Sequence, residues 1–169
     1  LKVHLQGKGI LGMESQTVSN TTMGTVTESG VKTWNASFFI PSQSYTKTTV
    51  DGATAETIVS MAVVDKEFKK YFAYPSSKIE KDLDGNIVTT TYEVNTDYGY
   101  PESEMADYGN GMNKTIQYTD YVFSGGSYRP QLITRTQKHT DDSTPFTQKT
   151  HVTYDLEKGW KKQIIDNYK

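Results

Sequence analysis

The chain has 169 residues, contains no cysteine and carries a formal net charge of -2. Without cysteine it can have no disulfide framework, thiolate nucleophile or cysteine-ligated zinc, and its scattered, nearly balanced charges offer no positive surface for nucleic acid. Apolar residues make up only 34% of the chain; threonine, tyrosine and serine take their place, which is typical of sheets with a wet face.

The first residues alternate between polar and apolar side chains. Val3 and Leu5 lie on one face of a strand in this pattern. Because the chain begins at Leu1, without methionine or a leader, with residues that suit the middle of a strand, we expect it to be a piece of a longer protein. Nowhere does an apolar run approach the roughly 18 residues that a membrane-spanning helix needs.

Similar alternation recurs along the chain and predicts further strands. These lie around Val26 and over 32–38, 58–64, 87–94, 113–121, 132–138 and 147–154. Residues 56–70 also allow a helix, but their β-branched side chains favour a strand followed by a charged turn at Asp65-Lys66-Glu67. Glycine-containing turn signals separate the strands, Ser29-Gly30 and Gly125-Gly126 among them, so the chain is predicted to form a series of antiparallel hairpins.

One phrase repeats along the chain, from a proline through an Asx-Gly pair to a tyrosine. In the copies that begin at Pro75 and Pro101, the glycine follows after 10 residues and the tyrosine after 17. Such a period indicates an array of supersecondary units, none of which can bury its apolar face alone. The repeat-like units lie near 40–70, 74–95, 100–121 and 129–155.

Seven residues of these units are predicted to shape the architecture. Glycine at a hairpin tip accepts the positive φ that a tight turn requires, and proline is tolerated at a strand start because its missing N–H costs least there. The predicted turn glycines are Gly52, Gly85 and Gly111, and the predicted strand starts are Pro41, Pro75, Pro101 and Pro130.

Three motifs together resemble the YD-repeat, or RHS-repeat, proteins. They are the closing Tyr154-Asp155, the turn Asp84-Gly85-Asn86 and the phrase Gly7-Lys8-Gly9-Ile10-Leu11-Gly12-Met13, in which Ile10 and Met13 stand where the family usually has aromatic residues. The resemblance implies a bacterial, extracellular or cell-surface protein. It also implies a long antiparallel ribbon that curls into a shell around a toxic or effector polypeptide.

From the repeats and the resemblance together, we expect residues 1–169 to be a single all-β segment. Its fold should be an antiparallel β-hairpin ribbon, curved or partly closed, and its role structural. Family members that release cargo carry a self-cleaving core with essential aspartates after the repeats. Nothing after Tyr154 resembles that core, so we expect no catalysis and no cofactor.

Candidate chemical sites have simpler structural interpretations. His4, His139 and His151 lack the spacing of metal ligands. Two acidic pairs, Asp82 with Asp84 and Asp141 with Asp142, could offer oxygen atoms to calcium but are more typical of turn caps. The acids around Tyr98, namely Asp97, Glu102, Glu104 and Asp107, lack a frame that would set a glycosidase spacing.

Aromatic residues suggest an alternative function, a cell-surface adhesion or carbohydrate-binding module. The candidate glycan contacts are Trp34 and Trp160, although packing between hairpins is the more usual role of such rings. Asparagines in three glycosylation sequons, Asn20, Asn35 and Asn113, are interpreted as polar turn residues. A homodimer through an edge strand, 1–6 or 160–167, is a further hypothesis.

Overall fold

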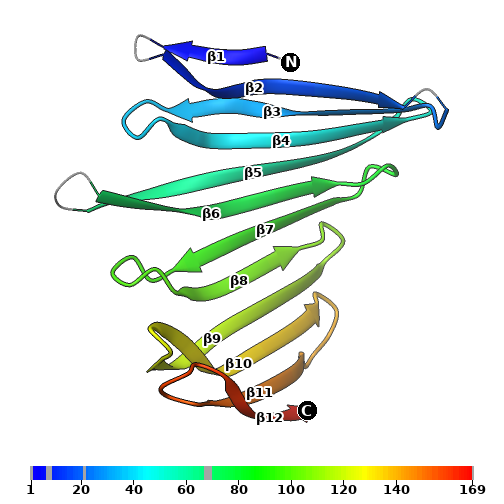
Figure 1. Ribbon diagram of the computed structural model, residues 1–169. Coiled ribbons are helices and arrows are strands. Elements are labelled where there is room, and N and C mark those ends of the chain that lie inside the picture. Colours follow the sequence, from blue (N-terminus) through cyan, green and yellow to red (C-terminus); the bar gives the residue numbers. More distant parts are fainter. Residues whose placement is uncertain (1, 7–8, 21, 67–69, 169) are drawn as a thin grey trace. The chain divides into compact units, whose positions relative to one another are not determined.

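The computed structural model describes residues 2–6, 9–20, 22–66 and 70–168, and over these residues the chain is all-β. The strands pair in chain order from β1 to β12 (Figure 1), so the predicted antiparallel hairpin ribbon is confirmed. Their bounds are β1 Lys2–Gln6, β2 Gly9–Asn20, β3 Thr25–Asn35, β4 Ile40–Val50, β5 Ala53–Lys66, β6 Lys70–Lys81, β7 Ile87–Val94, β8 Pro101–Asp107, β9 Met112–Ser124, β10 Ser127–His139, β11 Phe146–Tyr154 and β12 Lys161–Tyr168.

The chain divides within β7 into two compact units, Leu1–Thr89 and Thr90–Lys169. In the first unit, β4 pairs with β3 on one side and β5 on the other, and β6 follows β5. In the second, β9, β10, β11 and β12 follow β8 in the same manner. Among the described residues, none lies in a helix long and apolar enough to cross a membrane.

Each repeat predicted from the sequence corresponds to one hairpin. The copy that begins at Pro75 spans β6, its turn and β7, and the copy that begins at Pro101 spans β8 and β9. The glycines at the tips, Gly52, Gly85 and Gly111, have φ of +84°, +89° and +85°. They therefore have the left-handed conformation that the turn signals predict.

Two of the four prolines do not begin a strand. Pro101 is the first residue of β8 and Pro41 the second of β4, as predicted, but Pro75 and Pro130 lie inside β6 and β10. The prediction that all four mark strand starts is therefore wrong.

Irregular pairing explains why proline is tolerated inside these strands. Beside Pro75 the ladder to β5 has a register shift after Ser60. Pro130 lies opposite Tyr121, next to Asp120, whose φ is +54°. Bulges leave a backbone group outside the regular ladder, so a missing N–H is least costly there.

Two local predictions near the N-terminal half are also wrong. Ser29-Gly30 does not turn but lies inside β3, where a Cβ on Gly30 would come within 2.4 Å of the Glu14 carbonyl oxygen. Glycine is present there for close strand approach. The strand predicted over 32–38 ends at Asn35, and a turn follows.

The remaining local predictions differ in outcome. Residues 56–66 are strand and not helix, as preferred, but the prediction of a turn at Asp65 and Lys66 is wrong, because both residues pair with β6. Glu67 of that turn lies outside the described residues, as do Gly7 and Lys8 of the glycine phrase. The sequence does not predict β2, β4, β6 or β8 as strands, since none of them has a clear alternation of polar and apolar residues.

Four loops share one design, in which an Asn or Asp side chain organises five residues. The side-chain oxygen of the first residue accepts N–H bonds from the residues two and three positions later, at 2.9 to 3.2 Å. This arrangement is an Asx turn. The first residues are Asn20, Asn35, Asn95 and Asp155.

The fifth residue of each of these Asx loops has positive φ. These residues are Gly24 (+60°), Phe39 (+56°), Gly99 (+76°) and Gly159 (+72°). In the last three loops its backbone N–H also donates to the carbonyl of the first residue at 2.8 Å. Side chain and backbone thus fix the chain reversal together, and with it the register of the two strands.

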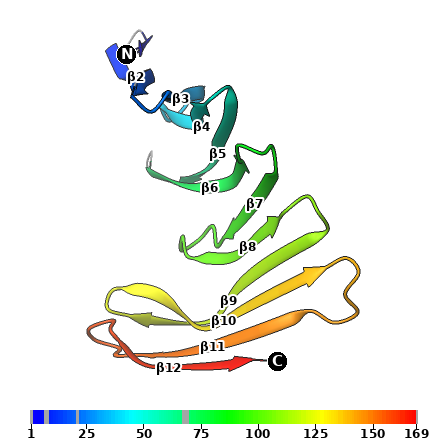
Figure 2. The same ribbon diagram turned by 90° about the vertical axis from the view of Figure 1, so that its right-hand side faces the viewer.

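A small core forms at one end of the second unit. In β11, Thr150, Val152 and Tyr154 are buried while the residues between them are exposed. At the same end of the unit, the β9–β10 turn meets the β11–β12 loop (Figure 2). Gly125 N–H donates to the Leu156 carbonyl at 3.1 Å, so the two chain reversals are joined.

The contact between these two reversals predicts unequal costs for two neighbouring substitutions. Gly125 and Gly126 both have positive φ, but a Cβ on Gly125 would lie 2.7 Å from the Gly159 Cα, whereas one on Gly126 would meet nothing within 4 Å. We expect Gly125→Ala to lower the free energy of unfolding by about 1 kcal/mol or more beyond Gly126→Ala, because only the first adds a clash to the backbone strain. Urea unfolding followed by circular dichroism measures both; equal losses would contradict the contact.

Candidate functional site

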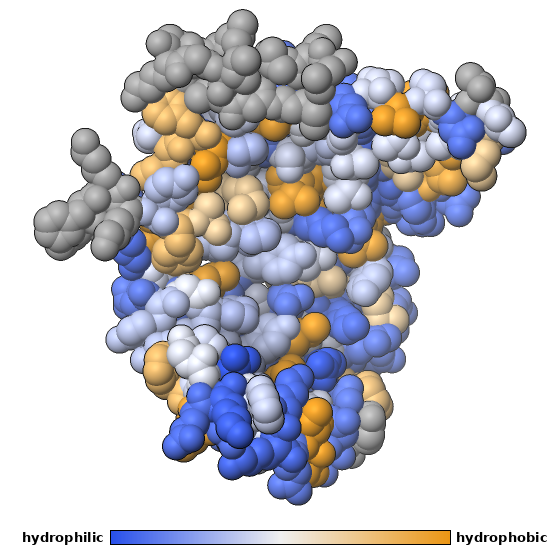
Figure 3. All heavy atoms as spheres, viewed as in Figure 1, coloured by the Kyte–Doolittle hydropathy of each residue, from blue (hydrophilic) through white to orange (hydrophobic). Residues whose placement is uncertain are grey.

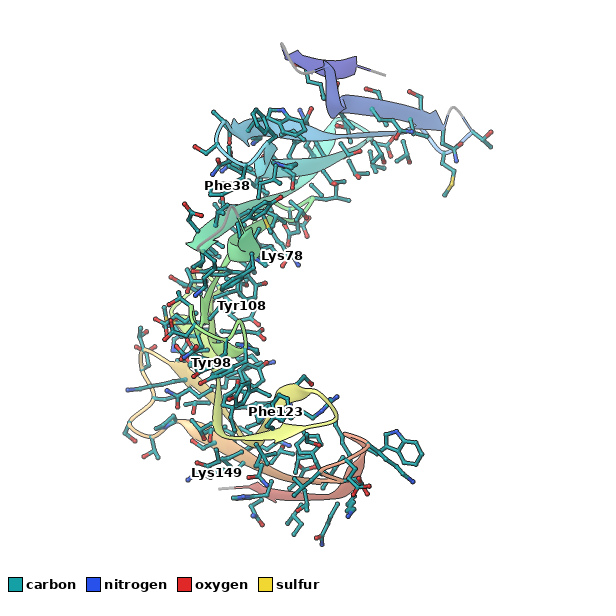
Figure 4. All side chains as sticks on the ribbon, turned by 60° about the vertical axis from the view of Figure 1, so that its left-hand side comes forward. Phe38, Lys78, Tyr98, Tyr108, Phe123 and Lys149 are labelled. Atoms are coloured by element: carbon teal, nitrogen blue, oxygen red, sulfur yellow. The ribbon has the colours of Figure 1, made fainter. Side chains whose placement is uncertain are left out.

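An aromatic cluster in the second unit is the most prominent surface feature. We call it the tyrosine surface; its members are Tyr98, Tyr100, Tyr121, Phe123 and Tyr128. Tyr100 and Tyr121 are stacked with ring centroids 4.0 Å apart, and Tyr128 lies within 5.5 Å of three other rings. Tyr98 and Phe123 are labelled in Figure 4, where side chains project from both sides of the strands.

Local backbone structure brings these rings together. Tyr98 is the fourth residue of the Asx loop that begins at Asn95, and Tyr100 follows that loop. Phe123 pairs directly with Tyr128 across the β9–β10 hairpin. Residues separated by up to 30 positions thus converge through one loop and one hairpin.

Two hollows border the tyrosine surface. One of about 450 Å³ is lined mainly by rings of the surface together with Pro101 and Ser127. The other, of about 410 Å³, adds polar side chains, among them Glu93, Glu102 and Gln117. Tyr98 is 66% exposed and Phe123 60% exposed, so their ring faces are accessible to a flat apolar ligand face.

Tyrosine hydroxyls beside the hollows are hydrogen-bonded. Tyr121 donates to the Pro101 carbonyl, and Tyr118 donates to Glu104 Oε1 at 2.6 Å. Burial, and after it the bond to Glu104, raises the pKa of Tyr118 to about 12. The pKa of Tyr121 is also raised, first by burial and then by the neighbouring Tyr100. Both hydroxyls are therefore neutral donors at physiological pH.

The acidic residues considered as chemical groups are engaged in local structure. Asp82 accepts two bonds from Asn86, and the Asn86 side-chain bond is the main reason that its pKa is lowered. Asp142 accepts the His139 N–H at 2.9 Å. Near Tyr98, Glu102 accepts a bond from Asn95 and Glu104 accepts the Tyr118 hydroxyl.

The structure does not bring the histidines together. His139 Nε2 lies 3.1 Å from the Asn110 carbonyl, and its Nδ1 lies 3.2 Å from the Asp141 backbone nitrogen, so the ring holds a turn. His151 lies exposed on β11, while the side chain of His4 is outside the described set. Over the residues described, no group of three or more potential ligands could hold a metal ion.

The two tryptophans differ in exposure. Trp160 is 68% exposed, with Lys158 Nζ 5.0 Å from its ring centroid, whereas Trp34 is partly buried and pairs with Pro41 on the neighbouring strand. Of the sequon asparagines, Asn20 and Asn35 hold Asx loops, and Asn113 lies in β9.

Sequence reasoning missed both the tyrosine surface and the Asx loops. A signal for the loops was present, because Asn35, Asn95 and Asp155 recur at intervals of 60 residues. For the tyrosine surface the sequence offered only abundant tyrosine, since its rings converge through strand pairing.

The high pKa of Tyr118 predicts alkaline loss of stability. A neutral tyrosine that the fold favours stabilises the protein fully below the unfolded pKa of 10.0 and loses that contribution as pH rises toward about 12. We expect Tyr118→Phe to lose less stability than the parent between pH 9 and about 11.5, measured by urea unfolding. Tyr128→Phe, a tyrosine of the tyrosine surface, is the control, and parallel pH profiles for Tyr118→Phe and the parent would refute the assignment.

Comparison of the chain with protein families, curated proteins and solved structures gave no match.

Proposed function

We propose that this chain is a non-catalytic structural segment of a YD/RHS-repeat protein. It forms part of a β-shell that encloses or presents another polypeptide, a toxin or effector. The supporting observation is that, within each unit, the antiparallel sheet is a single layer. Among the described residues, only Ser124, Thr150, Val152, Tyr154 and Gly159 are buried.

A single layer suits a wall between two environments. Most globular domains pack one sheet against a second layer and so bury one face. Here polar and apolar side chains are interspersed on the visible face of each unit (Figure 3), and most described strand residues are only partly covered. Both faces can therefore meet water or a polar partner, which an extracellular or cell-surface bacterial shell would require.

The hydrogen bonds of the polar side chains also support a structural role. Asn35, Asn95 and Asp155 hold loops, and Tyr154 donates to the Pro130 carbonyl at 3.1 Å across neighbouring strands. Residues that could serve chemistry are thus committed to fixing strand register. This use of side chains is what a repeat wall needs.

Protection of an enclosed polypeptide tests the shell. In the complete protein that carries this segment, we expect limited proteolysis to leave a second, non-repeat polypeptide intact while the sheet is folded. Gly125→Ala should speed its digestion because the variant weakens the wall, and Gly126→Ala should do so less. Mass spectrometry of the digests measures the survival of the non-repeat polypeptide and its rate of digestion in both variants. A folded sheet with every non-repeat region cleaved at the same rate in all variants would contradict enclosure.

A second candidate function, carbohydrate binding, is favoured by one observation, the exposed tyrosine surface. Sugar rings place their C–H faces against aromatic rings, and their hydroxyls need polar neighbours. The hollow with Glu93, Glu102 and Gln117 supplies such neighbours beside Tyr100 and Tyr121. On this alternative the site would be the tyrosine surface, with exposed Trp160 in the same unit as a second candidate.

Sugar titration tests this alternative. Calorimetry with neutral oligosaccharides should show binding that Tyr98→Ala weakens by about tenfold, from the loss of one ring contact. Trp160→Ala distinguishes the two candidate positions, and Tyr71→Ala, which removes a 42% exposed tyrosine of the first unit, is the matched control. Equal affinity in Tyr98→Ala and the parent would exclude the tyrosine surface.

A further inference from the structure

The two hollows beside the tyrosine surface differ in chemistry but share one ring, that of Tyr100. The hollow of about 450 Å³ is lined mainly by rings. The hollow of about 410 Å³ adds two acidic residues, Glu93 and Glu102. Volumes of this order suit a ligand the size of a short oligosaccharide and exceed what a single small ion needs.

The rings of the first hollow stand at steep angles to one another and so enclose it from several sides. Tyr128 is tilted by 54° to Tyr98 and by 53° to Tyr100, and its ring lies at 70° to that of Phe123. Each aromatic face carries the negative side of a quadrupole, which attracts C–H groups and cations. Among the residues that the structure describes, no lysine or arginine lies over these rings, so their outer faces are open to a ligand.

The two glutamates of the second hollow are exposed, and each is oriented by one hydrogen bond. Ser103 Oγ donates to Glu93 Oε2 at 2.8 Å, and Asn95 Nδ2 donates to Glu102 Oε1 at 3.0 Å. Each carboxylate has a second oxygen that can accept from a ligand. The ion pairs within the described part of the chain involve neither glutamate. Both carboxylates can therefore take a cationic partner.

The charge that faces the hollows is negative, because no basic side chain of the described residues lines either of them. Arg129 follows Tyr128 in the chain, but its Nε donates to the Ser124 carbonyl at 3.1 Å. Its guanidinium carbon lies 5.8 Å from the ring centroid of Tyr154, outside the tyrosine surface. This charge distribution disfavours an anionic ligand and attracts a cationic one.

We propose that the tyrosine surface binds amino sugars whose amine is free and therefore protonated. The C–H face of the sugar lies against the rings, its ammonium group meets Glu93 and Glu102, and its hydroxyls bond to neutral polar neighbours such as Ser103 and Gln117. The proposal rests on the carbohydrate-binding alternative and names its ligand class. A neutral sugar leaves the two carboxylates unused, and a simple alkylammonium ion leaves the neutral polar groups unused.

Calorimetry with a matched pair of oligosaccharides tests the role of the amine. The probes are a trisaccharide of glucosamine with free amines and the same trisaccharide with every amine acetylated. At about pH 6 and low salt the sugar amines carry their protons and charges are weakly screened. We expect the free-amine trisaccharide to bind about tenfold more tightly, because each of two exposed charge pairs contributes about threefold.

Removal of one carboxylate at a time tests the site. Glu93→Gln and Glu102→Gln keep the side-chain shape and an acceptor oxygen, so each should weaken binding of the free-amine trisaccharide by about threefold and leave that of the acetylated one unchanged. The matched control is Asp141→Asn, which removes the charge of an 88% exposed side chain in the turn at the far end of β10. It should change neither affinity.

The outcomes separate this proposal from the carbohydrate-binding alternative. Equal affinity for the two trisaccharides, with both weakened by Tyr98→Ala, would overturn the amino-sugar proposal and leave carbohydrate binding standing. Binding of neither would overturn both. An effect of Asp141→Asn as large as that of Glu93→Gln would also overturn the proposal, as would choline binding as tightly as the free-amine trisaccharide. Circular dichroism confirms that each variant is folded.

Discussion

Four strand pairs of the described residues depend on how an Asx loop reverses the chain between them. In the Asx loops, one side-chain oxygen holds two backbone N–H groups and a residue of positive φ closes the loop. These restraints are local, so they do not depend on long-range contacts. Because a slip by one residue would turn every side chain to the opposite face, fixing the loop fixes both faces of the sheet.

The fifth position of these loops, which has positive φ, is glycine in three loops and phenylalanine in one. Gly24, Gly99 and Gly159 occupy it without steric cost, but Phe39 adopts the same conformation at φ +56°. A non-glycine residue there is strained. The backbone hydrogen bonds that the Asn35 side chain and carbonyl accept within the loop offset that strain.

A sheet with so few buried residues must be stabilised largely along its strands. Cross-strand pairs supply contacts that need no second layer, such as Thr27 with Thr48 and Tyr45 with Glu28, at 3.3 and 2.5 Å. Threonine and tyrosine suit this arrangement because each combines strand propensity with a hydroxyl that tolerates water. The same composition leaves ring faces accessible, and the candidate binding surface follows from that exposure.

Much of this architecture could be read from the amino-acid sequence. Period-two alternation gave the strand class and placed β7 at 87–94, and Asx-Gly pairs located the hairpin tips at Gly52, Gly85 and Gly111. These features are local, and the backbone conformation of a turn depends on the few residues within it. Proline was less informative, because whether it can lie inside a strand depends on local irregularities of the pairing, such as the register shift beside Pro75 and the positive φ of Asp120 near Pro130.

The tertiary structure decided which distant residues meet. Tyr100 stacks on Tyr121, and the β9–β10 turn packs against the β11–β12 loop, where Gly125 N–H donates to the Leu156 carbonyl. Both outcomes depend on register and on the irregular backbone at Asp120, which change the face on which a side chain lies. A pattern along the chain reports alternation within one strand, but convergence between strands arises only when they pair.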